Sequence, residues 1–404
     1  MPHLIVFSHL RWEFVFQRPQ HLLSRLARDY HIVFVEEPVH GSGPAYLERT
    51  TPADGIEVLR AHTPVEHWGF HDDQLAALQP MIAGYLAARR IDDYLVCFYT
   101  PMALPLLGEL TPRAIVYDCM DELAAFKGAP RQMRQRESAL LKTADLVVTG
   151  GPRLYEAKRD ANPNVLCVPS AVDGAHYAAA RATADAEAMA KAAALQGAIA
   201  RPRLGFFGVI DERLDLDLVA RLADADPSWH VVMVGPVAKI APETLPRRTN
   251  LHWLGQQPYA LLPQLVAGWD VCLMPFAINE STEFISPTKT LEYMAAGKPI
   301  VSTPIHDVRV MFGDLVAIAG EPEAYVAACR AALAESAAAR AAREERMLAR
   351  VREHSWDAAA AKIGNALAAA LAAAHARTAR SSAAADAGER GDEAMAPRTL
   401  ASAG

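Results

Sequence analysis

Apolar and polar positions along the chain form a repeating pattern, in which apolar runs of four to eight residues alternate with longer helical stretches. Few polar residues interrupt these runs, which indicates strands that are buried on both faces. Alternation of such strands with helices is typical of a parallel sheet. In the first half of the chain the predicted strands cover residues 4–8, 31–37, 94–99, 114–121, 145–151 and 165–170.

A second series with the same pattern begins after an alanine-rich break. Each series is long enough to build its own doubly wound sheet, so we predict an α/β fold with two consecutive Rossmann-like domains. Two such domains face each other across a cleft, which is where ligands prefer to bind. In the second series the predicted strands cover residues 203–210, 230–236, 251–256, 270–276, 299–304 and 315–320.

The same pattern places the domain boundaries. We predict a first domain over residues 1–177, a connection with helical character over 178–202, and a second domain over 203–350. A long final helix is predicted over 351–377. Residues 378–404 contain almost no large apolar side chains, so burial cannot offset the entropy of ordering them, and we predict a disordered tail.

Composition narrows the class of protein. Of the 404 residues, 51% are hydrophobic and 22% are charged, as expected for a globular protein, and the net charge of −7 gives no support to nucleic-acid binding. No apolar run reaches the ~20 residues that cross a bilayer. The start "MPHLIVFSHLRWEF" lacks a cationic region and a cleavage site, so we interpret it as a strand. The five cysteines form no CxxC pair, which favours reduced thiols and a cytoplasmic location.

One stretch, "EFISPTKTLEYMAAGKPIVST", points to chemistry. Ser286 and Pro287 are typical of the start of a helix, predicted here over 287–296. Lys289 adds a positive charge in the first turn, and Glu292 lies on the same face. A cation near free N–H groups suits a diphosphate, and a carboxylate one turn later suits sugar hydroxyls. The alternative is a capped surface helix with a Lys–Glu pair.

This stretch resembles the donor-site signature of retaining glycosyltransferases of the GT-B fold, particularly the family 4 group. The likeness covers about residues 3 to 330 and is greatest to glycosyltransferases of bacterial cell-surface polysaccharides, some related to teichuronic acid biosynthesis. It also rests on "FSHLRWEFVFQRPQHLLSRLA", "YDCMDE", "GFFGVIDERLDLDLV" and "WDVCLMPF". The resemblance implies transfer from a nucleoside-diphosphate sugar, held by the second domain, to a glycan or lipid-linked acceptor held by the first. It implies no further cofactor.

The resemblance also assigns donor contacts. The family usually has two glutamates eight positions apart; Glu292 matches the second, which binds the ribose, but Phe284 occupies the position of the first, next to Glu283. We therefore expect neighbouring polar groups to handle the sugar. The alternative for Arg213 is a solvated arginine at a helix start. The expected donor-binding residues are Gly208, Arg213, Ser286, Thr288, Lys289 and Glu292.

The acceptor is expected near the loop after the first strand, because that loop faces the cleft in a doubly wound sheet. Its donors and aromatic rings suit a carbohydrate, although Trp12 and Phe14 could instead pack the loop. Asp118 and Asp121 end another strand at the same edge, where helix capping is the alternative. We expect His9, Arg11, Trp12, Arg18 and Asp121 to bind the acceptor, and Lys289, Arg213, His21 and Asp118 to be catalytic.

Three further interpretations complete the prediction. Asp215 and Asp217 spell a DxD motif, but they lie in a helical pattern, so we expect no metal. The basic residues of 130–142 favour a solvated helical face over peripheral contact with the inner face of a membrane. Rival functions are a nucleotide-sugar epimerase and a non-catalytic subunit that binds the nucleotide sugar; the missing first glutamate supports the latter.

Overall fold

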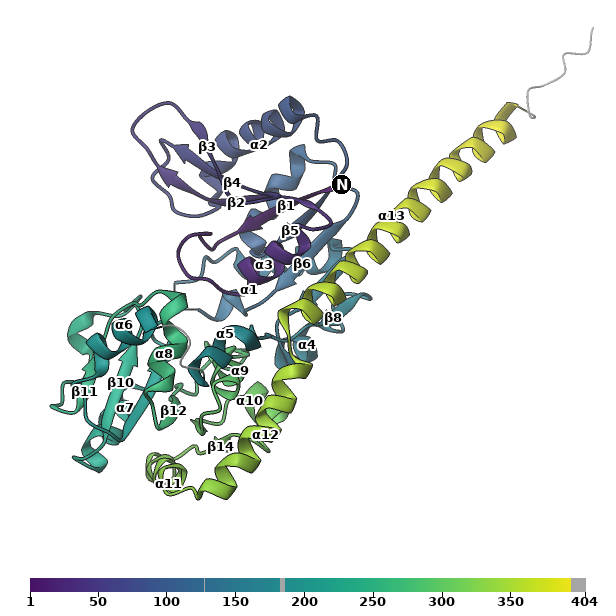
Figure 1. Cartoon of the computed structure of the whole chain (residues 1–404). Helices are drawn as coiled ribbons and strands as arrows, with labels where there is room; N and C mark the ends of the chain where they lie inside the picture. The colour runs from purple at the N-terminus through teal and green to yellow at the C-terminus, as the bar shows by residue number, and fades with distance from the viewer. Residues whose placement is uncertain (127, 182–185, 394–404) are drawn as a thin grey trace, which may run out of the picture.

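The computed structural model describes residues 1–126, 128–181 and 186–393. Figure 1 shows two α/β domains, one built from the first half of the chain and one from the second, with a long helix returning along the first. Among the described residues, no helix combines the length and the apolarity needed to cross a bilayer. All five cysteines are free, and four of them are buried.

The first domain contains an eight-stranded sheet in the order β3-β4-β2-β1-β5-β6-β7-β8, in which only the β3–β4 pair is antiparallel. β1, β5 and β7 are almost wholly buried apolar strands, which explains why their sequences lack polar alternation. The strands are β1 (His3–Ser8), β2 (His31–His40), β3 (Tyr46–Ala53), β4 (Ile56–Thr63), β5 (Tyr94–Phe98), β6 (Ile115–Cys119), β7 (Leu146–Thr149) and β8 (Val165–Cys167).

Helices cover both faces of this sheet and divide its core into two clusters. One cluster packs under α2, η2 and α3, and the other under α1 and the last helix of the chain. The helices are α1 (Arg18–Leu26), η1 (Asp72–Gln74), α2 (Leu75–Arg89), η2 (Pro101–Glu109), η3 (Leu123–Ala125), α3 (Met133–Thr143) and α4 (Pro152–Lys158), where η denotes 3-10 helix.

The second domain contains a six-stranded, wholly parallel sheet in the order β11-β10-β9-β12-β13-β14. Its strands are β9 (Arg203–Phe207), β10 (His230–Val234), β11 (Leu251–Trp253), β12 (Val271–Met274), β13 (Ile300–Ser302) and β14 (Ala317–Ile318). Its helices are α7 (Leu216–Ala225), η5 (Pro242–Thr244), η6 (Tyr259–Leu261), α8 (Leu262–Ala267), α9 (Lys289–Ala295), α10 (His306–Phe312), α11 (Pro322–Leu333) and α12 (Ala337–Glu353).

The chain passes twice between the domains. α5 (Gly174–Ala178), η4 (Ala179–Arg181) and α6 (Ala186–Gln196) lead from the first sheet to the second. α13 (Trp356–Glu393) leads back and packs on α1 and β7 of the first domain. Its buried residues from Trp356 to Ala370 therefore belong to the core of the first domain, although they follow the second in sequence.

The end of the chain differs from the sequence prediction. α13 continues to Glu393, whereas the sequence predicts disorder from residue 378. In Figure 1 this last part of α13 projects beyond the domains. Alanine, the strongest helix former, is frequent there, so local propensity favours continuation of the helix. Residues 394–404 of the predicted tail lie outside the described residues.

Trp356 is the main anchor of α13, because its ring is buried and stacks on His21 of α1 at 4.6 Å between ring centroids. We expect Trp356→Ala to lower the free energy of unfolding by about 3–5 kcal/mol, because it removes a large buried side chain. Urea unfolding followed by circular dichroism measures this loss. Truncation after residue 377 is the control and should leave the midpoint unchanged, since it keeps every side chain of α13 that is described as buried, up to Ala374. A stable Trp356→Ala protein would show that α13 docks without this anchor.

Candidate functional site

The two domains enclose a cleft of about 640 Å³. The carboxyl ends of parallel strands from both sheets point toward it, as expected for a doubly wound fold. The first domain contributes the loop between β1 and α1 together with Met120, Asp121 and Ser170. The second contributes residues 206–209 and 234–236, Arg213, the segment 256–259, and residues 285–289 with Glu292.

The stretch at residues 283–303 forms a helix and strand as predicted, but the helix is shorter. α9 begins at Lys289, and its N-cap is Thr288 without a side-chain capping bond, so Ser286 is not the cap. Ser286 instead lies against Gly151 of the first domain, where an added Cβ would come within 2.7 Å of the Ser286 Cβ. α9 has only seven residues, and Lys289 supplies the positive charge at its start.

Packing holds Lys289 at the floor of the cleft. Gly208 follows β9 with φ of +146°, and an added Cβ there would lie 2.3 Å from the Lys289 Cε, so only glycine fits both the backbone and the space. The Lys289 Nζ lies 5.9 Å and 6.0 Å from the ring centroids of Phe206 and Phe207. Burial lowers the Lys289 pKa, although the charge of Glu292 opposes this shift. Within the described part of the chain the ammonium forms no ion pair, which leaves it available to an anion.

Glu292 lies one turn further along α9 and is only 9% exposed. Burial raises its pKa to about 7, while Lys289 and the neighbouring side chains of Tyr177 and Thr288 act in the opposite direction. The carboxylate still lines the cleft. It is therefore a hydrogen-bonding group that a ligand in the cleft can reach.

Arg213 enters the cleft from the loop after β9 and is fixed by Asp211. Its Nε lies 3.0 Å from both carboxylate oxygens of Asp211, and its Nη2 lies 2.7 Å from Oδ2. The guanidinium carbon also lies 5.7 Å from the ring centroid of Phe126 in the first domain. Asp211 is buried, so the pair costs desolvation but holds the arginine in one orientation. Asp211 was not predicted from the sequence, because in this loop only a cation was expected.

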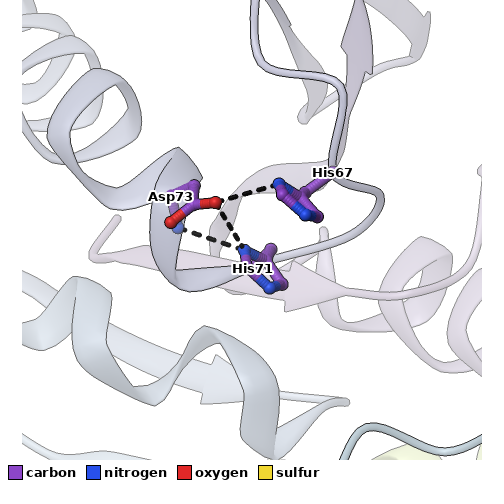
Figure 2. A group of neighbouring side chains, drawn as sticks. All are labelled: His67, His71 and Asp73. Atoms are coloured by element: carbon purple, nitrogen blue, oxygen red, sulfur yellow. Dashed lines mark hydrogen bonds and ion pairs between the residues drawn. The ribbon is translucent and has the colours of Figure 1, made fainter.

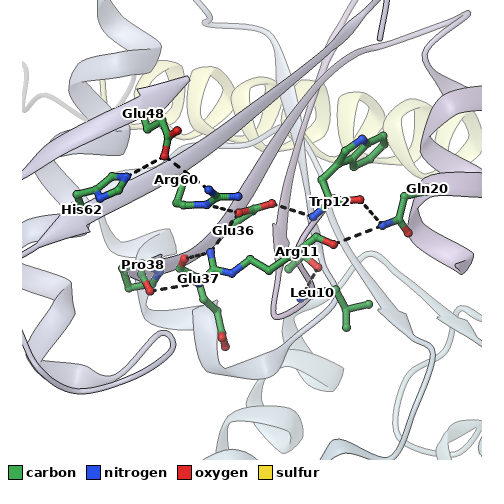
Figure 3. A network of polar contacts seen from close by, with 11 residues as sticks. Leu10, Arg11, Trp12, Gln20, Glu36, Glu37, Pro38, Glu48, Arg60 and His62 are labelled. Atoms are coloured by element: carbon green, nitrogen blue, oxygen red, sulfur yellow. Dashed lines mark hydrogen bonds and ion pairs between the residues drawn. The ribbon is translucent and has the colours of Figure 1, made fainter. Parts of the chain in front are cut away.

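In the first domain, Arg11 supports the fold and does not line the cleft. Figure 3 shows Glu36, in the middle of β2, at the centre of a polar network. Arg11 Nη1 donates to Glu36 at 3.1 Å, Arg60 Nε donates to it at 2.7 Å, and the backbone N–H of Trp12 donates to it at 2.8 Å. Arg11 also donates to the Glu37 carbonyl. Arg11 therefore has protein partners, and the network positions Trp12, which does line the cleft.

Arg18 and Asp118 form a buried ion pair. They are 2% and 3% exposed, the Arg18 Nε lies 3.1 Å from Asp118 Oδ1, and the Arg18 Nη1 donates to the Val168 carbonyl at 2.8 Å. Arg18 borders the cleft, but Asp118 is not among its lining residues. The predicted catalytic role of Asp118 therefore has no support from its position, because its carboxylate is neutralised by Arg18. Asp121 does line the cleft, and burial raises its pKa to about 6 against the opposing charges of Arg213 and Arg18.

The two predicted histidines also lie outside the lining. His21 is sandwiched by aromatic rings, stacked on Trp356 and edge-on to Phe16 at 4.6 Å, and burial lowers its pKa to about 3. It therefore packs α1 against α13. Burial lowers the pKa of His9 to about 4. An imidazole with so low a pKa stays neutral at pH 7.

Next to the cleft, the segment before α9 binds the first domain. Glu283 forms an ion pair with Arg153 of α4 at 2.6 Å, and the Arg153 guanidinium carbon lies 5.6 Å from the ring centroid of Phe284. Asp307 of α10 accepts a bond from the Arg153 backbone N–H at 3.0 Å. Neither Glu283 nor Phe284 lines the cleft, so Glu283 does not take the place of the missing first glutamate.

The two aspartates of the DxD motif lie at the start of helix α7. Asp215 caps α7, since its Oδ1 accepts from the Leu218 N–H at 2.8 Å. Asp217 is exposed in the first turn of the same helix. Neither lines the cleft, so the pair offers no metal site beside a donor diphosphate.

Comparisons with known proteins agree with this geometry. Residues 201–335 match the family model described as Glycosyl transferases group 1. The chain is 25% identical over 276 residues to the putative teichuronic acid biosynthesis glycosyltransferase TuaH of Bacillus subtilis strain 168. The aligned region covers 64% of this chain and 68% of TuaH.

Solved structures share the fold at low identity. Sucrose-phosphate synthase of Thermosynechococcus elongatus superposes with a TM-score of 0.68 and 16% identity, covering 92% of this chain and all of that one. The structure described as trehalose-6-phosphate from E. coli bound with UDP-2-fluoro glucose superposes with a TM-score of 0.66 and 14% identity. The match covers 90% of this chain and 98% of that one. Anabaena HepE in complex with UDP and glucose superposes with a TM-score of 0.64 and 16% identity. The match covers 91% of this chain and all of that one.

These matches confirm the predicted fold and resemblance. The chain has the GT-B architecture of two domains around a cleft. The match to the group 1 glycosyltransferase model falls within its second domain and α11. Lys289, Glu292 and Arg213 all lie within the matched residues.

The raised pKa of Glu292 predicts a pH-dependent cost to folding. The unfolded chain ionises this glutamate near pH 4.5, whereas the folded protein keeps its proton up to about pH 7. Glu292 should thus cost the wild type stability between these values, and Glu292→Gln should lack this part of the loss. Above pH 8 we expect the variant to be more stable by roughly 2–3 kcal/mol, and below pH 4.5 the two should agree. Denaturant unfolding across pH measures this; a constant difference would contradict it.

Proposed function

We propose that this GT-B glycosyltransferase transfers a sugar from a nucleoside-diphosphate sugar to a glycan or glycolipid acceptor during synthesis of cell-surface polysaccharide. The observation that carries the proposal is the cleft itself. It brings Lys289, Glu292 and Arg213 of the second domain opposite Trp12 and Asp121 of the first. The likeness to TuaH supports the cell-surface role.

For the donor we propose a UDP-sugar. Solved proteins of the same fold are described with UDP or UDP-2-fluoro glucose, which makes uridine the first base to test. In this proposal Lys289 and Arg213 meet the diphosphate, and the backbone at Gly208 approaches it closely. Glu292 accepts hydrogen bonds from the ribose. Ser286 and Thr288, which border the same part of the cleft, contact the sugar.

The chemical task of these residues is to stabilise the leaving group. As the bond between sugar and diphosphate breaks, negative charge grows on the diphosphate, and a cation fixed beforehand in a dry site stabilises it strongly. Lys289 suits this task because it is buried, held by packing, and has no carboxylate partner among the described residues. Retention of anomeric configuration is proposed from the resemblance to retaining enzymes.

The acceptor is proposed to lie against the first domain. Trp12 offers an aromatic face, Arg18 borders the cleft, and Asp121 offers a carboxyl group whose raised pKa suits hydrogen bonding to a hydroxyl. Peripheral contact of this domain with a membrane, through the exposed Arg131 and Arg134, stays a prediction.

Lys289→Met tests the assignment, because methionine keeps much of the stem and loses the charge. We expect kcat to fall about 10²–10³-fold with a smaller change in KM, which is the scale of one electrostatic group that acts in the transition state. Glu292→Gln should instead raise mainly KM, because ribose contacts are alike in ground and transition states. Steady-state kinetics of sugar transfer measures both.

Lys142→Met is the matched control, since Lys142 is exposed on α3 of the first domain. Its kinetics should equal the wild type. Circular dichroism establishes that each variant folds. If Lys289→Met keeps a near-normal kcat, the lysine is not the charge that stabilises the diphosphate.

We propose that transfer needs no divalent metal and no cofactor other than the sugar nucleotide. Lys289 and Arg213 supply positive charge at the proposed diphosphate position, which is the role that a metal has in other glycosyltransferases. Activity in excess EDTA should therefore equal activity without it. Loss of activity that Mg²⁺ or Mn²⁺ restores would contradict this expectation.

A non-catalytic subunit is the second candidate, and one observation favours it. Phe284 occupies the position of the first family glutamate, and Glu283 is paired with Arg153. Such a protein would bind nucleotide sugar yet neither transfer nor hydrolyse it. Binding without turnover across a panel of donors and acceptors would select this candidate.

A further inference from the structure

A compact group of metal-ligand side chains lies in the first domain outside the cleft. It belongs to the loop of residues 64–74, which joins β4 to α2 through η1. His67, His71 and Asp73 each turn a ligand atom toward a common point, and these atoms lie within 4.8 Å of one another (Figure 2). None of the three lines the cleft, so the group is separate from the proposed donor and acceptor positions.

The distances within this group match a metal site. The Nδ1 atom of His67 lies 2.9 Å from Asp73 Oδ2, and the Nδ1 atom of His71 lies 3.6 Å from the same oxygen. Ligand atoms around a tetrahedral zinc ion, at Zn–N and Zn–O distances of about 2.0–2.1 Å, are about 3.3 Å apart. The two rings are stacked at 4.2 Å with an interplanar angle of 10°, so they must tilt apart before both Nδ1 lone pairs can point at one ion.

We propose that His67, His71 and Asp73 bind a zinc ion, with the remaining coordination position open to solvent. Two imidazoles and one carboxylate suit Zn²⁺, whereas Mg²⁺ and Ca²⁺ prefer oxygen ligands alone. The side chains of His67, His71 and Asp73 are 60%, 34% and 57% exposed, so an ion reaches them from solvent. Binding replaces the contact between His67 Nδ1 and Asp73 Oδ2 with bonds to the metal.

Neighbouring residues hold the loop in a conformation that suits the ion. Buried Gln74 donates from Nε2 to the His67 carbonyl at 2.8 Å and accepts from the Thr63 hydroxyl at 2.7 Å. Phe70, between the two histidines, is buried in the core of the domain. Arg136 of α3 donates to the Phe70 carbonyl at 3.4 Å. The backbone that carries the ligands is therefore fixed at several points, which lowers the entropy lost on binding.

One existing contact changes on binding. The backbone N–H of Asp73 donates to the His71 Nδ1 at 3.2 Å, which caps η1. Coordination by that Nδ1 exchanges this long hydrogen bond for a bond to the metal, while the charge of Asp73 stays beside the ion. The exchange requires the His71 ring to rotate out of its stack on His67.

Calorimetric titration of the full chain with ZnCl₂ tests the proposal. The wild type should bind one equivalent of zinc at this site, with no comparable heat from MgCl₂. His67→Gln and Asp73→Asn, which keep side-chain size and polarity, should each weaken the zinc Kd by at least about tenfold, because each removes one of three ligands. His71→Asn should do the same while retaining a residue that can cap η1.

His252→Gln is the control, because His252 and His230 form another close imidazole pair, 3.0 Å apart, in the second domain. Its zinc titration should equal the wild type. Loss of binding in this control, or unchanged binding in the three loop variants, would overturn the proposal. His67→Gln should also keep wild-type transfer activity, so a failure of this inference is distinguishable from a failure of the proposed function.

Discussion

The proposed chemistry depends on a buried cation in the cleft that forms no ion pair with any described carboxylate. Lys289 has this property because packing alone positions it. Its stem lies against Gly208, where a side chain would occupy the same space, and its ammonium lies near the rings of Phe206 and Phe207. Burial disfavours the charge, as the lowered pKa indicates, so an anionic ligand gains more from it than from a solvated lysine.

Other charges of the cleft walls are arranged in the opposite way. Arg18 is paired with Asp118 and Arg213 with Asp211, and the network of Glu36 holds the loop that carries Trp12. Paired charges inside a protein fix geometry more than they add stability. They shape the walls, while the lysine of α9 and the carboxyl groups with raised pKa are left for ligands.

Much of this architecture could be predicted from the sequence. Buried parallel strands have apolar runs without alternation, so the parallel strands of both sheets could be predicted. The stretch before β13, which the sequence predicted to bind the donor, lies at the cleft. The antiparallel pair β3 and β4 was missed, because β3 is exposed and polar and gives no such run. The helical end of α13 was missed because its composition lacks large apolar residues while its alanines favour helix.

Side-chain roles in the first domain could not be predicted in the same way. The sequence placed Arg11, Arg18, His21 and Asp118 near the cleft, but their partners are distant in the chain. Arg18 and Asp118 are separated by 100 residues, and His21 meets Trp356 from the last helix. A pattern of nearby residues cannot show that such charges are already neutralised or such rings already packed.

Release of the nucleoside diphosphate tests the central claim most directly. Purified protein would be incubated with UDP-sugars, with and without a polysaccharide or glycolipid acceptor fraction, and UDP would be quantified over time. Our account predicts that at least one donor releases UDP and that the acceptor raises the rate, with the sugar recovered on the acceptor. Donor binding without release would contradict it, and so would conversion of the sugar that does not depend on acceptor.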